Sequence, residues 1–286
     1  MKQISPGNVV IGSILIVFAF FTFMPFYYVV LTSISNPDLI RNGELLLWPK
    51  GFDLNAYSII LNNERFITAF SNTIVRTVLG IVINLTLQLS FAYALSKAYL
   101  PGRKFFMLFM IITMLFNGGI IPTYLIVKGT GLIDTVWALI IPAAISTWNV
   151  ILLRSFFENV PASMEESAKM DGANDFTIFT KIYIPLSTAS IATIGLFIAV
   201  HHWNTYMDAV IYINSADKQV LQIFLRDMVV QMEMASLLGD TGVLSKTSSL
   251  SVRTASIFLV SLPIIIVYPF IQRFFVKGVM LGAVKG

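Results

Sequence analysis

The chain contains only two histidines, His201 and His202, and no cysteine. Adjacent residues on a helix point about 100° apart, so these imidazoles cannot chelate one ion as residues four apart can. Without cysteine there is no thiolate nucleophile and no thiolate metal ligand. The sequence also lacks H-E-x-x-H, G-x-S-x-G and the EF-hand loop. We therefore expect no catalytic residue, no metal site and no resident cofactor.

The run GDTGVLSKT, residues 239–247, loosely resembles a phosphate-binding loop. That motif requires Gly immediately before its Lys, but Ser245 precedes Lys246. We reject the match. The chain thus has no nucleotide-hydrolysing motif, and any ATP hydrolysis that drives it must come from another protein.

Polar side chains inside apolar runs offer a different chemistry, recognition of a solute. A charge at mid-bilayer costs about 2.5–3.5 kcal/mol on insertion scales, so intramembrane polar residues are functional candidates. The charged ones, Arg76 and Asp208, lie near the ends of runs, which argues against a proton relay or a voltage sensor. Amides and aromatic rings suit a neutral or hydroxyl-rich solute. The candidates for such a pathway are Gln88, Asn117, Asn149, Trp203, Asn204 and Tyr206.

A structural reading of the same residues stays open. Asn84, Gln88 and Asn149 would equally serve to hydrogen-bond neighbouring helices. Trp203 and Tyr206 would equally serve as anchors at the membrane interface.

The composition indicates that these residues belong to a membrane protein. Of 286 residues, 56% are hydrophobic and 12% are charged, and the mean hydropathy is +0.80. Soluble domains carry about 25% charged residues. The chain is therefore predicted to be an all-α polytopic membrane protein, a single domain over residues 1–286. Its first apolar run is too long for a signal peptide and lacks an A-x-A-like exit, so it is expected to remain as a span.

Six apolar runs are long enough to cross a bilayer, which takes roughly 20 helical residues. They cover about residues 9–31, 74–96, 105–125, 135–157, 187–206 and 255–275. With both termini in the cytoplasm, the inside stretches hold ten Lys and Arg in 60 residues and the outside stretches eight in 93. This excess of positive charge predicts cytoplasmic termini and a cytoplasmic loop at 161–186.

Two outer loops are expected to contain helices. One lies around residues 57–65. In the other, Val220, Phe224, Leu225 and Met228 recur at helical spacing.

The loop 161–186 holds four of the fifteen acidic residues of the chain. Ser163 and Glu166 have the spacing of a capping box, which predicts a short helix from Met164 to Asp171. Gly172 is placed to end it in a left-handed conformation, and Asn174 to cap a second short helix that runs toward Pro185. The small residues Ser167, Ala168, Gly172 and Ala173 would let another surface approach closely.

The segment EESAKMDGANDFTIFTKIYIPLS resembles the cytoplasmic signature loop of bacterial ABC importer permeases. That signature is roughly E-A-A-x-x-x-G followed by I-x-L-P. Glu166, Ser167 and Ala168 match E-A-A, with Ser replacing Ala at the second position. Asp171, Gly172 and Ala173 match the D-G-A of the sugar-importing branch, and Ile182, Ile184 and Pro185 match I-x-L-P with Ile replacing Leu.

The resemblance extends over most of the chain. The segments 116–132, 152–161, 201–210 and 262–286 are similar to those of carbohydrate permeases of the maltose-type second subunit, with their W-N motif at Trp203 and Asn204. The pattern is most similar to the branch for complex oligosaccharides derived from pectin, rhamnogalacturonan or alginate.

The resemblance implies a type I importer transmembrane domain that imports an oligosaccharide by alternating access. Implied partners are a second homologous permease, two copies of a cytoplasmic ATPase that bind ATP and Mg, and an extracytoplasmic solute-binding protein. The residues implied to couple the permease to the ATPase are Glu165, Glu166, Ser167, Ala168, Asp171, Gly172, Ala173 and Pro185. The chain itself would not be an enzyme, and it would lie in the bacterial cytoplasmic membrane.

Three alternatives remain. An ABC importer permease for a different solute would share all of these features. An ion-coupled secondary transporter would show charged mid-span residues and usually an inverted repeat, and the sequence displays neither. An intramembrane enzyme would need a catalytic constellation inside the spans, which the motif search does not find.

Overall fold

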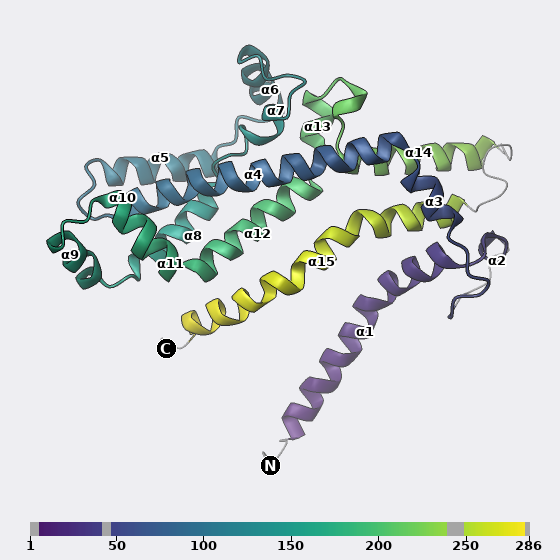
Figure 1. Cartoon of the computed structure of the whole chain (residues 1–286), viewed down its shortest axis with the longest axis horizontal. Coiled ribbons are helices and arrows are strands. Elements are labelled where there is room, and N and C mark those ends of the chain that lie inside the picture. Colours follow the sequence, from purple (N-terminus) through teal and green to yellow (C-terminus); the bar gives the residue numbers. More distant parts are fainter. Residues whose placement is uncertain (1–5, 42–46, 239–248, 284–286) are drawn as a thin grey trace. The chain divides into compact units, whose positions relative to one another are not determined.

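The computed structural model describes residues 6–41, 47–238 and 249–283. All regular secondary structure in these ranges is helical, which confirms the all-α class (Figure 1). The rejected phosphate-loop segment 239–247 lies outside the described residues, and so does the extreme C-terminus. The elements are α1 (Pro6–Ile34), α2 (Pro37–Arg41), α3 (Asn55–Leu61), α4 (Glu64–Ser96), α5 (Arg103–Leu115), α6 (Ile120–Gly129), α7 (Trp137–Ile140), α8 (Thr147–Glu158), α9 (Ala162–Met170), α10 (Asp175–Ile178), the π-helix η1 (Phe179–Tyr183), α11 (Ile184–Leu186), α12 (Thr188–Asn204), α13 (Met207–Tyr212), the 3₁₀-helix η2 (Ala216–Lys218), α14 (Leu221–Leu238) and α15 (Ser249–Ala283).

The chain divides into two compact units. Unit 1 comprises residues 1–67 and 224–263, and unit 2 comprises residues 68–223 and 264–286. The prediction of one domain over 1–286 stays a prediction.

Unit 1 joins α1 and α3 to parts of α14 and α15. The hydroxyls of Ser33 and Tyr57 are 2.7 Å apart, and the Tyr57 ring meets Phe258 edge-on. Along α1, large apolar side chains from Val9 to Phe26 are exposed, as expected of a helix that faces lipid or a partner. Helices are also present near the two positions predicted for the connecting loops: α3 ends at Leu61 within the segment 57–65, and α14 covers Phe224, Leu225 and Met228.

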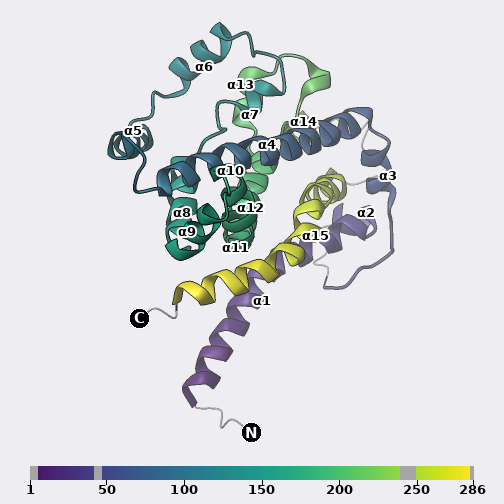
Figure 2. The same cartoon turned by 60° about the vertical axis from the view of Figure 1, so that its left-hand side comes forward.

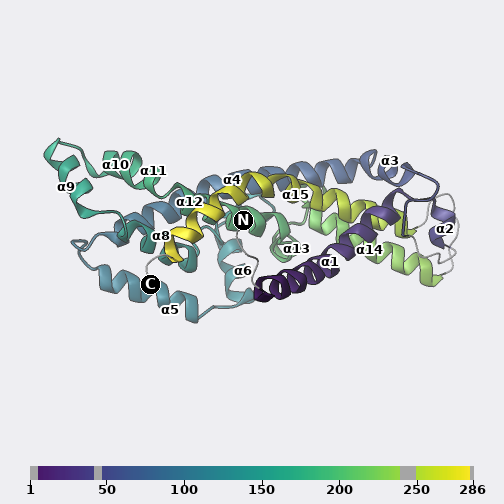
Figure 3. The ribbon, with the colours of Figure 1, turned by 90° about the horizontal axis from the view of Figure 1, so that it is seen from below.

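Unit 2 contains most of α4, and Leu89, Ala92 and Leu95 of this helix belong to its core. Helix α8 contacts both α5 and α12. The shared core consists of Leu89, Ala92, Leu95, Met110, Val150, Leu153, Phe157, Ile178, Tyr183, Ile194 and Ile198. In Figures 1 and 3, α9 and α10 lie at the end of unit 2 where α4 ends and α5 begins.

Candidate membrane spans fall into two kinds. Residues 9–34, 64–96 and 250–270 form three long apolar helices. Two further spans would be bent: α5 and α6 meet at 116°, and the helical segment 175–186 meets α12 at 85°. Figure 2 shows α6 turned away from α5. The helix is interrupted between Leu115 and Ile120, where Gly118 and Gly119 lie, and Pro122 lies in the first turn of α6.

The sixth expected span, residues 135–157, is not a continuous helix. Helix α7 ends at Ile140 and α8 begins at Thr147. Pro142 lies in the interruption, where it cannot donate a backbone hydrogen bond and disfavours a helical conformation of Ile141. By length and composition the described residues therefore hold three to five spans rather than six.

Candidate functional site

The loop 161–186 begins with α9, whose start differs from the prediction. The helix begins at Ala162, and Pro161 stands at its N-cap with φ −59° and ψ 129° and no side-chain capping bond. Ser163 lies inside the first turn, so the predicted capping box with Glu166 is wrong. The fixed φ of proline suits the residue at which a helix begins, and α9 starts two residues earlier than the predicted Met164.

The end of α9 confirms the predicted role of Gly172. Its φ is +79°, and its N–H donates to the Lys169 carbonyl at 3.0 Å. The N–H of Ala173 donates to the Ala168 carbonyl at 2.9 Å. These two bonds form a Schellman motif, which satisfies carbonyls that the helix end leaves unpaired.

The second predicted cap is also confirmed. Asn174 Oδ1 accepts from the Thr177 N–H at 2.8 Å at the start of α10. The chain continues through η1 into α11, where Pro185 occupies the first turn. It then turns by 85° into α12, so Pro185 lies just before the return of the chain into the bundle.

The small residues of the loop do not all face outward. Ala168 and Ala173 pack against the core of unit 2, whereas Ser167 and Gly172 are exposed. Two of the small side chains therefore pack inside the protein instead of forming a surface for a partner. Their small size lets α9 lie directly on the core.

Glu165 ties α9 to the end of α4. Its Oε2 accepts from Lys97 Nζ at 2.6 Å and from the Tyr183 hydroxyl at 2.7 Å, and its Oε1 accepts from Lys169 Nζ at 2.7 Å. Partial burial opposes ionisation, but the hydrogen bonds from Lys169, Lys97 and Tyr183 outweigh it and lower the pKa of Glu165 to about 2. We call Lys97, Glu165 and Tyr183 the α9 clasp.

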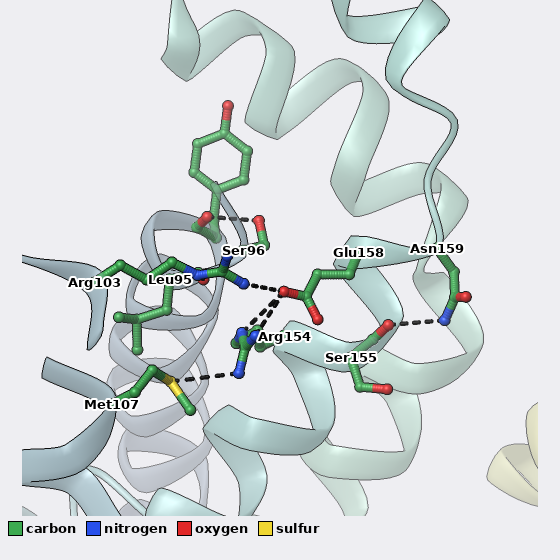
Figure 4. Close-up of polar contacts among 9 residues, drawn as sticks. Leu95, Ser96, Arg103, Met107, Arg154, Ser155, Glu158 and Asn159 are labelled. Atoms are coloured by element: carbon green, nitrogen blue, oxygen red, sulfur yellow. Dashed lines mark hydrogen bonds and ion pairs between the residues drawn. The ribbon is translucent and has the colours of Figure 1, made fainter. Parts of the chain in front are cut away.

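A second ion cluster fixes the neighbouring helix ends (Figure 4). Arg103 and Arg154 both point to the Glu158 carboxylate, and Arg154 Nη2 donates at 2.7 Å. Arg103 Nε also donates to the Leu95 carbonyl at 2.8 Å, near the C-terminus of α4. Arg103 at a helix start and Glu158 at a helix end are each unfavourable to their own helix dipole, and their pairing offsets this.

Deeper in unit 2, polar side chains follow one face of α4. We call Arg76, Asn84 and Gln88 the α4 polar stripe. Arg76 is fully buried, pairs with Asp208 and donates from Nη1 to the Thr205 carbonyl at 2.8 Å. The stripe thus begins by joining α4 to the end of α12 and the start of α13.

The other two stripe residues hold the interruption between α7 and α8. Asn84 Nδ2 lies 3.3 Å from the Ala143 carbonyl, and Gln88 Nε2 donates to the Ala144 carbonyl at 3.0 Å. Carbonyls freed by a helix break inside a membrane need such partners. The structural reading of Asn84 and Gln88 therefore has direct support.

His202 completes this contact from α12. Its Nε2 lies 2.9 Å from Asn84 Nδ2, and the ring is fully buried against Gly80. Among the described residues, no group of three or more His, Asp or Glu side chains is placed to hold a metal ion.

The remaining pathway candidates do not form one cluster. Asn149 and Trp203 are buried, and Trp203 meets the Phe70 ring edge-on. Asn204 and Tyr206 are exposed. Asn117 is exposed as well, and its Oδ1 accepts from the Gly119 N–H at 2.9 Å within the α5–α6 break.

Several residues that organise the site were not singled out from the sequence. Lys97, Tyr183 and Gly80 form contacts between segments distant in the chain, which no local pattern reveals. The stripe could have been found, because residues 76, 80, 84 and 88 recur every four positions on one helix face.

The geometry is that of an all-helical polytopic membrane protein with bent candidate spans and a short exposed helix anchored at one end of unit 2. Residues 66–281 match the family described as binding-protein-dependent transport system inner membrane component, and the chain belongs to this family. It is therefore a permease subunit of a binding-protein-dependent ABC importer in the bacterial cytoplasmic membrane, and it is not itself an enzyme.

Individual relatives agree over nearly the full length. The chain is 41% identical over 280 residues to the polygalacturonan/rhamnogalacturonan transport system permease YtcP of Bacillus subtilis, covering 98% of each chain. It is 38% identical to protein LplC of the same organism, covering 93% of this chain and 90% of LplC. A crystal structure of a bacterial ABC transporter involved in the import of the acidic polysaccharide alginate contains a chain that superposes with a TM-score of 0.87 at 36% identity, covering 96% of this chain and 98% of that one.

Proposed function

We propose that this chain lines, together with a second homologous permease, the membrane path by which an ABC importer takes up an oligosaccharide. The observation that carries the substrate class is the full-length similarity to the permease named for polygalacturonan and rhamnogalacturonan and to a chain of the alginate importer. The polymers named for these relatives contain uronic acid, so an acidic oligosaccharide is the first candidate. An extracytoplasmic solute-binding protein delivers it to the outer face.

The proposed docking element for one of the two cytoplasmic ATPase subunits is α9 with the turn that follows it. Met170 is 89% exposed and Phe176 is 73% exposed, although both are large and apolar. Large apolar side chains that are exposed on the surface of a protein are typical of a site that a partner covers. Glu166, Ser167 and Asp171 are exposed on the same segment and would contact the ATPase, which binds the ATP and Mg.

The other coupling residues would hold this surface in place. Ala168 and Ala173 pack on the core, Gly172 forms the turn, Pro185 precedes the 85° bend, and Glu165 attaches α9 to α4. With the loop and both termini in the cytoplasm, as the distribution of Lys and Arg favours, closure of the ATPase dimer would move α9 and switch the bundle between inward-facing and outward-facing states.

For the solute pathway we propose two kinds of residue. Asn117, Asn204 and Tyr206 are exposed and can reach hydroxyl groups of a sugar. Gln88, Asn149 and Trp203 are buried, and they would hold in place the residues that line the path.

The decisive experiment is reconstitution of this chain in proteoliposomes with the second permease, the ATPase and the binding protein. We expect oligogalacturonides, rhamnogalacturonan fragments or alginate oligosaccharides to stimulate ATP hydrolysis and to accumulate inside. A neutral arabino-oligosaccharide and maltose test whether acidity matters. Absence of stimulation by every sugar would overturn the substrate class, and uptake by this chain alone under an ion gradient would favour a secondary transporter.

A further inference from the structure

Glu165 is the one acidic side chain of the loop 161–186 that is turned into the protein. Glu166, Asp171 and Asp175 are exposed, whereas the Glu165 side chain is 12% exposed. Both of its oxygens are occupied, by Lys97 and Tyr183 on one side and by Lys169 on the other. A surface helix that only needed to stay soluble would not require such a contact.

Lys97, the partner of Glu165, is equally enclosed. It directly follows the last residue of α4, and its side chain is 7% exposed. Its ammonium group lies 4.2 Å from the ring centre of Tyr93 and 3.9 Å from that of Tyr183. Cation–π contacts and the negative end of the α4 dipole both favour the charge at this position. The pair is therefore fixed in one geometry, unlike an exposed ion pair.

The clasp joins three elements: α9, η1 and α4. Besides the clasp, α9 makes apolar contacts through Ala168, and its Lys169 ammonium lies 4.8 Å from the ring centre of Tyr99. The segment after α9 adds Ala173 and a bond of 3.2 Å from the Tyr93 hydroxyl to the Asp175 carbonyl. Among the described residues, Lys97–Glu165 is the one ion pair between α9 and α4. The far part of α4 carries the polar stripe, which contacts α12, α13 and the interruption after α7.

We propose that the Lys97–Glu165 pair is a positioning contact that transmits movement of α9 to α4. This inference rests on the proposed coupling role of α9. Apolar contacts at Ala168 allow sliding, whereas a directional, desolvated ion pair resists it, so displacement of α9 draws the end of α4 with it. Both side chains are turned into the protein, so we expect neither to contact the ATPase. The pair therefore determines what fraction of the ATP hydrolysis cycles moves the membrane helices and transports solute.

The test compares variants of the full transporter in proteoliposomes with its ATPase, second permease and binding protein. We expect Glu165→Gln and Lys97→Met to retain co-purification of the ATPase and to hydrolyse ATP, but to use about tenfold more ATP per oligosaccharide transported, within the usual range of coupling energies. Glu158→Gln is the matched control, because it removes the ion pairs with Arg103 and Arg154 near the same end of α4 and leaves the contacts of Glu165 in place. It should leave the ATP-to-solute ratio unchanged.

A reversible tether separates transmission from simple structural support. The chain has no cysteine, so Glu165→Cys with Lys97→Cys introduces the only two thiols of this subunit. In a complex whose other subunits lack reactive cysteines, a bis-methanethiosulfonate linker of matching length should bring the ATP-to-solute ratio back to the wild-type value. Cleavage of the linker by a reductant should raise the ratio again. If Glu165→Gln prevents assembly, Tyr183→Phe removes one bond to Glu165 and keeps the ring over Lys97, and it should raise the ratio to a smaller extent.

The outcomes separate this inference from the proposed function. If the wild-type complex shows no ATP-driven uptake, the coupling role of α9 itself fails. If the wild type is coupled and either Glu165→Gln keeps the wild-type ratio or the tethered double variant stays uncoupled, the transmission role of the clasp is wrong.

Discussion

The imidazole of His202 lies directly against the backbone of Gly80 on the neighbouring helix. A Cβ placed on Gly80 would lie 2.5 Å from His202 Nε2 and 2.9 Å from its Cγ. The ring is fully buried and contacts Asn84 through the same Nε2, so it has little room to move away. Helices α4 and α12 thus approach closely at Gly80, which lies on the same face of α4 as the polar stripe and has no side chain.

This relationship predicts that Gly80→Ala destabilises the protein. Overpacking of this kind costs about 1–3 kcal/mol, because the ring must shift and lose its contact with Asn84. The measurement is the thermal melting of the purified permease complex in detergent. Gly195→Ala is the control, since its Cβ would meet Leu85 Cδ2 at an ordinary 3.7 Å. Equal melting temperatures for the two variants would contradict the prediction.

The buried pair of Arg76 and Asp208 supports a second prediction. Asp208→Asn would leave the fully buried guanidinium without its ionic partner, although the bond to the Thr205 carbonyl would remain. Removing one partner of a buried pair costs about 3 kcal/mol or more. The variant complex should therefore melt at a clearly lower temperature. Lys218→Met, which breaks the exposed pair with Asp134, serves as the control and should change the melting temperature little. A larger effect of the control than of Asp208→Asn would refute the argument.

The conformation of Gly172 supports a third prediction. Nothing lies within 4 Å of a Cβ on this residue, so backbone conformation alone limits substitution. Asn tolerates φ near +79°, while Ala is strained by about 1–2 kcal/mol. Proline has a fixed negative φ and also loses the N–H that bonds Lys169. We expect co-purification of the ATPase to decrease in the order Gly, Asn, Ala, Pro. Undiminished ATPase binding by Gly172→Pro would show that the turn is not needed for docking.

Local patterns predicted the helical class, the turn at Gly172 and the cap at Asn174, because each depends on residues adjacent in the chain. The capping box failed because Pro161 initiates the helix earlier. The prediction of one continuous helix over residues 135–157 is wrong, because hydropathy does not take into account Pro142 or the hydrogen bonds from α4 side chains that stabilise the interrupted backbone. Contacts such as Lys97 with Glu165 join residues 68 positions apart, and only the packed bundle brings them together.

The charge on Glu165 supports the last prediction, a dependence of stability on pH. Its pKa falls from an ordinary value of 4.5 in the unfolded chain to about 2 in the folded one, because Lys97, Lys169 and Tyr183 all donate hydrogen bonds to it. A lowered carboxyl pKa means that the unfolded state binds the proton more readily, so the contribution of Glu165 is fully present above about pH 4.5 and is lost as the pH falls toward about 2. The melting temperatures of the wild type and of Glu165→Gln should therefore differ by a constant amount above pH 4.5 and converge below it. Glu166→Gln, which alters an exposed neighbour, should show no such convergence. A difference between the wild type and Glu165→Gln that stays constant down to pH 3 would mean that the carboxylate is not stabilised by the clasp.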